Sequence, residues 1–132
     1  MSEEVNKLTP YHLLGGEAVL RQLVDRFYQI MAEEPKVLEL RKMHPEDLQG
    51  SADKLYMFLS GWLGGPDLYQ QKFGHPMLRA RHMPFPIDSS GRDQWMFCMI
   101  KALSEVPMEA ALKAQLEQAF FRTADFMRNQ DA

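Results

Sequence analysis

Apolar residues recur at three- and four-residue spacing along most of the chain, and this period predicts amphipathic helices. The longest stretches with this pattern cover residues 17–34, 48–62, 92–106 and 112–127. No segment combines strict alternation of apolar and polar residues with the turn signals of a hairpin. The pattern therefore predicts an all-α fold class with four substantial helices.

Capping residues, glycines and prolines predict where these helices begin and end. Thr9 before Pro10 is typical of a helix start, and Gly64-Gly65-Pro66 is typical of a sharp helix end. Ser90 is followed three residues later by Asp93, which matches a capping box, so we expect Ser90 to be an N-cap. Shorter helical pieces are expected at residues 10–14, 36–41 and 67–73.

Length and composition favour one folded domain over residues 1–132, with residues 1–10 as an N-terminal extension and residues 128–132 as a frayed tail. Hydrophobic residues make up 45% of the chain, which excludes general disorder. The net charge of −3 gives no electrostatic signature of a nucleic-acid-binding protein. The single cysteine, Cys98, excludes an internal disulfide and a cysteine-based zinc site.

The chain shows neither a secretory signal nor an apolar run of the roughly 20 residues that a membrane helix needs. We therefore expect a cytoplasmic protein without a membrane partner. Gly64-Gly65-Pro66 is not a phosphate-binding loop, because no Gly-Lys-Ser/Thr follows it. Cys98 is flanked by Phe97 and Met99 and has no activating neighbour, which favours a packing role over a nucleophile.

The segment from Gly74 to Ile87 carries the most distinctive candidate chemistry. His82 stands at the end of a short basic run and is followed at once by Pro84 and Pro86, through which a regular helix cannot continue. Such a segment fixes one imidazole on a rigid, irregular element, as a metal or cofactor ligand requires. The residues alone leave a second interpretation open, namely a partly exposed histidine in a basic turn.

Aromatic residues with polar ends provide a second set of candidates. Tyr28 and Trp95 fall on the apolar faces of predicted helices, where a buried hydroxyl or indole N–H needs a polar partner. Each could instead pack with its polar end at the surface.

A series of motifs occurs in a characteristic order along the chain. They are Phe27-Tyr28, His44-Pro45-Glu46-Asp47-Leu48, Met57-Phe58-Leu59 running into Gly64-Gly65-Pro66, Tyr69, Gly74-His75-Pro76, Leu78-Arg79, Arg81-His82, Pro84-Phe85, Arg92-Asp93, Trp95 and Cys98-Met99. Together they resemble the group II branch of the truncated haemoglobins. The resemblance covers roughly residues 11–106, and the Gly-His-Pro to Arg-His-x-Pro-Phe stretch followed by a tryptophan is its most specific part.

The resemblance implies a two-over-two helical sandwich around haem b, in which the proximal helix is shortened to a loop and a single turn. It implies His82 as the proximal ligand of the haem iron. Tyr28, Trp95 and His44 are the implied distal donors to a bound ligand, although His44 could also swing to solvent. The implied partners of the haem propionates are Arg81, Arg79 and Lys54.

The resemblance also implies an apolar pocket around the haem. Its expected lining is Phe27, Ser51, Leu55, Phe58, Leu78, Phe85, Ile87 and Met99. Ser51 stands where many other globins place a distal histidine, so a second axial ligand from that helix is not expected.

The function implied by the resemblance is oxygen binding or transport at a five-coordinate iron, with NO and CO as further ligands. A polar distal pocket favours high affinity and slow release. The alternative is enzymatic, a nitric oxide dioxygenase or peroxidase-like activity that needs an external reductase. A third interpretation, a haem-free helical interaction domain, follows if the methionines and aromatic residues only pack.

Overall fold

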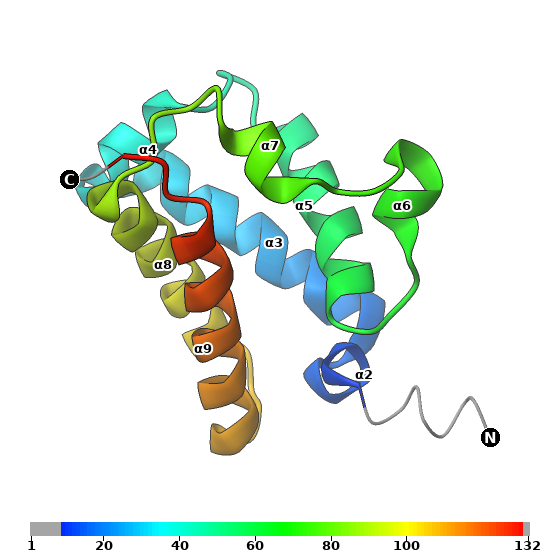
Figure 1. The fold of residues 1–132 in the computed structure, drawn as a ribbon. Helices are drawn as coiled ribbons and strands as arrows, with labels where there is room; N and C mark the ends of the chain where they lie inside the picture. Colours follow the sequence, from blue (N-terminus) through cyan, green and yellow to red (C-terminus); the bar gives the residue numbers. More distant parts are fainter. Residues whose placement is uncertain (1–8, 131–132) are drawn as a thin grey trace.

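The structure, a computed structural model, describes residues 9–130, and every regular element within that range is a helix. The elements are α2 (Pro10–Leu14), α3 (Gly16–Glu33), the 3-10 helix η1 (Pro35–Val37), α4 (Leu38–Lys42), α5 (Gln49–Trp62), α6 (Leu68–Phe73), α7 (Leu78–His82), α8 (Ser89–Ser104) and α9 (Ala110–Phe126) (Figure 1). The all-α class predicted from the sequence is confirmed. Within the described residues, no helix is long and apolar enough to cross a membrane.

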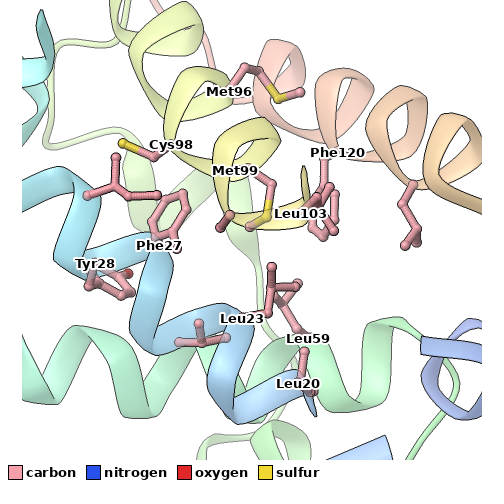
Figure 2. Close-up of a cluster of buried hydrophobic side chains, with 14 of the residues drawn as sticks. Leu20, Leu23, Phe27, Tyr28, Leu59, Met96, Cys98, Met99, Leu103 and Phe120 are labelled. Carbon is pink, nitrogen blue, oxygen red and sulfur yellow. The ribbon is translucent and has the colours of Figure 1, made fainter. Parts of the chain in front are cut away.

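The four long helices form two packed pairs. α3 packs against α5, α8 packs against α9, and α3 also packs against α8, which joins the two pairs (Figure 1). The core between them contains Leu23 and Phe27 from α3, Met99 and Leu103 from α8, and Phe120 from α9 (Figure 2). This arrangement follows from the amphipathic faces, since each helix buries its apolar stripe against a neighbour.

Both ends of α5 agree with the sequence prediction. The helix ends at Trp62, and Gly64 then takes a φ of 94°, a left-handed conformation that glycine adopts without strain. The chain turns back sharply enough for the Ser60 hydroxyl to donate a 2.6 Å hydrogen bond to the carbonyl of Pro66. Gly65 lies against the ring of Tyr11 from α2.

The start of α8 differs from the prediction. Asp88, not Ser90, is the N-cap, and its carboxylate accepts a 2.8 Å hydrogen bond from the Gly91 N–H. A carboxylate is favoured at this position because it also meets the positive end of the helix dipole. The Ser90 hydroxyl instead accepts from the Gln94 side chain within the first turns.

The ends of the chain bear on the predicted domain limits. Thr9 and Pro10 begin α2, and residues 1–8 of the predicted extension lie outside the described range. At the other end, Asn129 and Gln130 each donate a backbone hydrogen bond to the carbonyl of Ile87, at 2.9 and 3.1 Å. Residues 131–132 of the predicted tail lie outside the described range.

Candidate haem site

The predicted ligand His82 lies at the end of α7, a helix of five residues that buries none of its side chains. Met77 precedes the helix with a φ of 47°, and Pro84 follows it. The His82 imidazole is half-buried, and its Nδ1 lies 2.7 Å from the carbonyl oxygen of Leu78. Because a carbonyl oxygen only accepts, Nδ1 carries the proton, and the lone pair of Nε2 is free to bind a metal.

Two polar groups on neighbouring helices, the Tyr28 hydroxyl of α3 and the Trp95 indole N–H of α8, have no hydrogen-bond partner within residues 9–130. The ring of Phe27 contacts both, with centroids 4.9 Å from Tyr28 and 5.1 Å from Trp95. Figure 2 shows Phe27 of α3 pointing toward Cys98 and Met99 of α8, with Tyr28 next to it on α3. The structure thus brings the rings of both predicted donors into contact with one buried ring.

Tyr28 keeps its proton under ordinary conditions. Only 9% of the residue is exposed, and this burial raises the pKa of its hydroxyl far above the usual value of 10.0. A neutral hydroxyl is a hydrogen-bond donor, whereas a phenolate can only accept. Tyr28 can therefore donate a hydrogen bond to a ligand at any pH near neutrality.

His44, whose orientation the sequence left open, packs beside Tyr28. The two rings meet edge to face with centroids 6.0 Å apart, and His44 Nδ1 lies 2.9 Å from the carbonyl of Leu40. Burial is the main cause that lowers the pKa of His44, and the charges of Arg41 and His82 lower it further. His44 therefore favours the neutral imidazole, with Nδ1 as the donor to the carbonyl of Leu40.

The residues predicted to line the pocket fall into three groups. Phe27 and Met99 are fully buried in the core, and Phe85 is 41% exposed. The half-buried members are Ser51, Leu55, Phe58, Leu78 and Ile87. Apolar side chains of α5, of α7 and of the loop after α7 thus lie between the core and the surface, where a large flat apolar group can cover them.

The three cations predicted to pair with the haem propionates have different partners. Arg79 Nη1 donates to the carbonyls of Phe126 and Arg128, at 2.6 and 2.9 Å. A guanidinium in this position satisfies carbonyl groups at the end of α9. This arrangement gives Arg79 a structural partner that the sequence did not suggest.

Arg81 and Lys54 lie over aromatic rings. Arg81 donates through Nε to the carbonyl of Pro76, at 2.7 Å, and its guanidinium lies 5.8 Å from the ring centroid of Tyr69. The Lys54 Nζ lies 5.7 Å from the ring centroid of Phe73. The remaining N–H donors of Arg81 make no hydrogen bond within residues 9–130.

Sequence reasoning missed Asn129, which contacts the backbone around His82. Its Nδ2 donates to the carbonyls of Phe85 and His82, at 2.9 and 3.3 Å, and its Oδ1 accepts from the Ile87 N–H at 2.9 Å. These contacts span more than forty positions in the chain. No local pattern in the sequence signals them.

An open groove of about 990 Å³ follows the exposed face of α3 between the start of α5 and the end of α8. Of the predicted site residues it includes only Tyr28. The chemistry of the donors places the candidate site elsewhere, because His82 and Trp95 do not line this groove.

The donor set at His82 fits a haem iron better than a free metal ion. Within residues 9–130, no cluster of three or more His, Cys, Asp or Glu side chains could hold a metal ion. A haem iron needs only one protein ligand on its proximal side, because the porphyrin supplies the four equatorial nitrogens. One imidazole held through Nδ1, half-buried apolar side chains on α5 and α7, and two unpartnered donors on α3 and α8 match that requirement.

Comparison with known proteins shows the family of this chain. The family model of the bacterial-like globins matches residues 9–129. The group 2 truncated haemoglobin YjbI of Bacillus subtilis is 44% identical, over 92% of this chain and 89% of that one. The cold-adapted truncated haemoglobin of the Antarctic marine bacterium Pseudoalteromonas haloplanktis TAC125 is 50% identical, with a TM-score of 0.90 over 92% of this chain and 98% of that one.

The group II 2-on-2 haemoglobin of the plant pathogen Agrobacterium tumefaciens is 42% identical, with a TM-score of 0.91 over 94% of this chain and 96% of that one. The two packed helix pairs described above are thus the two-over-two sandwich expected from the resemblance. The chain belongs to the bacterial-like globin family, as a haem-binding globin of the group II truncated haemoglobins.

Proposed function

We propose that the chain holds haem b through His82 Nε2 and binds O2 reversibly on the opposite side, with slow release. NO and CO are further ligands of the same site. The observation that carries the proposal is the 2.7 Å hydrogen bond from His82 Nδ1 to the carbonyl of Leu78, because it makes Nε2 the nitrogen of the neutral imidazole that is available to a metal. Haem, when bound, supplies an iron with an open position for a diatomic ligand.

Trp95 and Tyr28 act as the distal donors. A diatomic ligand such as O2 carries partial negative charge when bound, so an N–H or O–H directed at it stabilises the bound state. Hydrogen bonds to charged groups contribute ~1.5–3 kcal/mol. Since ~1.4 kcal/mol changes affinity tenfold, one donor slows release by about ten- to a hundredfold. His44, next to Tyr28, adds a third polar group on this side.

Arg81 is the favoured partner of a haem propionate. It is adjacent to His82 in the chain, and its guanidinium has N–H donors without a hydrogen bond within residues 9–130. Lys54 is a second candidate from α5. Arg79 is the weakest of the three, because carbonyls of Phe126 and Arg128 occupy its Nη1.

The absorption spectrum of the purified protein tests this proposal. We expect a Soret band that His82→Ala abolishes or shifts strongly and that His75→Ala leaves unchanged. His75 is the matched control because it lies in the same segment and is exposed. Extraction of the haem by acidified ketone tests for the non-covalent b type. A missing Soret band after haem addition, or the same band in His82→Ala, would contradict the proposal.

A second use of the same donors is nitric oxide dioxygenation or peroxidase-like chemistry, with an external reductase as partner. The observation in its favour is that three polar side chains lie close together, where simple reversible binding needs one. Tyr28 and Trp95 contact the ring of Phe27, and His44 contacts the ring of Tyr28. Sustained consumption of NO or peroxide in the presence of a reductant would support it. A single turnover that ends in ferric protein would contradict it.

A further inference from the structure

The chain after α9 runs beside the loop that follows α7 (Figure 1). We call residues 126–130 the C-terminal strap. Within it, the side-chain amide of Asn129 acts both as hydrogen-bond donor and as acceptor. Nδ2 donates to the carbonyls of His82 and Phe85, Oδ1 accepts from the N–H of Ile87, and the backbone N–H of Asn129 donates to the carbonyl of Ile87.

A second contact joins α7 itself to the C-terminal strap. Arg79 donates to the carbonyls of Phe126 and Arg128, and its guanidinium lies 5.6 Å from the ring centroid of Phe126. Arg79 and Asn129 thus connect the chain before and after His82 to the C-terminal strap.

The C-terminal strap is in turn fixed to the α8–α9 pair. Asp125 Oδ1 accepts hydrogen bonds from Arg128 Nε at 2.7 Å and from Arg92 Nη1 at 2.8 Å. Arg92 belongs to the first turn of α8, so the ion pairs connect the end of α9 to the start of α8. These two cations lower the pKa of Asp125, which keeps it ionised near neutral pH.

α7 has no comparable support of its own. It is five residues long and buries none of them, and so short a helix is not stable by itself. Within the described part of the chain, every hydrogen bond that residues 75–87 make to another helix or tail goes to residues 126–130. The remaining hydrogen bonds of residues 75–87 are local, such as those from Arg81 to Pro76 and from His82 to Leu78.

We propose that the C-terminal strap sets the position of the haem ligand, with Asn129 as the positioning residue for His82. The amide of Asn129 fixes the backbone on the C-terminal side of His82 through the carbonyls of His82 and Phe85. The hydrogen bond from Nδ1 to Leu78 fixes the ring relative to the N-terminal side. This inference rests on the proposed role of His82 as ligand.

Two variants and one control test the inference. Asn129→Ala removes all side-chain bonds of the residue. Asn129→Asp keeps the shape and the acceptor for the Ile87 N–H, but turns the donor toward His82 and Phe85 into an acceptor. Arg122→Ala is the control, because Arg122 is exposed on α9 and its hydrogen bond goes to Gln118 of the same helix.

The first measurement is amide hydrogen exchange at Ile87 and Phe85 in the protein without haem. We expect Asn129→Ala to accelerate exchange at Ile87 about tenfold, which corresponds to ~1.4 kcal/mol. The second is the iron–histidine stretching band of the ferrous haem-loaded protein in resonance Raman. We expect this band to shift and broaden in both Asn129 variants and to remain unchanged in Arg122→Ala.

The outcomes separate this inference from the proposed function. An iron–histidine band in both Asn129 variants identical to that of the parent would overturn the positioning role while the haem site stands. A parent-like iron–histidine band in Asn129→Asp alone would also overturn it, because the hydrogen bonds donated by Asn129 Nδ2 would then have no effect on His82. A parent protein that binds no haem refutes the proposed function and with it the positioning role, whereas the exchange rates still report whether the loop is held.

Discussion

The indole of Trp95 is the side chain whose substitution gives the most direct test of slow ligand release. Trp95→Phe keeps a ring against Phe27 and Phe120 but removes the unpartnered N–H. We expect O2 to dissociate about ten- to a hundredfold faster, because a donor worth ~1.5–3 kcal/mol is lost. Stopped-flow replacement of O2 by CO measures the rate.

Trp62→Phe is the matched control for this prediction. Trp62 is also half-buried and also packs on Phe120, with centroids 5.0 Å apart, but it lies on α5 and its ring does not contact Phe27. Its substitution should leave the dissociation rate unchanged. Equal rates for Trp95→Phe and the parent would show that the indole N–H does not reach the ligand.

Tyr28 makes the free energy of unfolding depend on pH in the alkaline range. Burial raises its pKa in the folded state above the unfolded value near 10.0, so above that pH the unfolded chain loses a proton that the folded chain keeps. The contribution of Tyr28 to the free energy of unfolding is therefore fully present below pH 10 and declines above it. The free energy of unfolding of the parent should fall relative to that of Tyr28→Phe by ~1.4 kcal/mol per pH unit.

Urea unfolding of the parent and of Tyr28→Phe between pH 8 and pH 11 measures this difference. The other tyrosines are common to both proteins, so their ionisation cancels. A constant difference across the whole range would mean that Tyr28 ionises equally in the folded and unfolded states, contrary to its burial.

At the scale of elements, the sequence predicts those helices that local chemistry defines. The apolar period of α3 and the stop at Pro35 place that helix within one residue of its observed limits. The glycine after α5 likewise marks a true helix end, with the positive φ that the turn requires. These features depend on residues close together in the chain, and a sequence carries such information directly.

The start of α8 shows a case that the local sequence cannot decide, because two neighbouring residues could each act as the N-cap. Asp88 and Ser90 can both accept from a backbone N–H two or three residues on, and the pattern alone favours the capping box. The structure selects Asp88. The residue before it, Ile87, is held by Asn129, so a contact distant in sequence helps to decide where the helix begins.

The same limit applies to the candidate site. The types and order of His82, Tyr28 and Trp95 lead to the family, and the structure brings Tyr28 and Trp95 together around Phe27. The partner of Arg79 and the role of Asn129 could not be predicted, because both depend on how α9 ends beside α7. Tertiary packing, which no local period encodes, creates these contacts.

At the scale of the whole molecule, Phe120 joins the two helix pairs. It lies on α9, is 2% exposed, and places its ring 5.0 Å from Trp62 of α5 and 5.8 Å from Trp95 of α8. Rings at these separations stabilise each other beyond simple burial. Phe120 therefore adds an aromatic contact between the α3–α5 pair and the α8–α9 pair to the packing of α3 on α8.

Phe120→Ala should lower the free energy of unfolding by ~3–5 kcal/mol, since it removes a buried ring and leaves a cavity that rigid helices cannot fill. Domains of this size have a total stability of about 5–15 kcal/mol, so the variant should be close to unfolding.

Phe121→Ala is the neighbouring control. Phe121 is 41% exposed and lies under the guanidinium of Arg92, and its loss should cost about 1 kcal/mol or less. Urea unfolding followed by circular dichroism compares the two, and equal losses would show that Phe120 does not join the helix pairs.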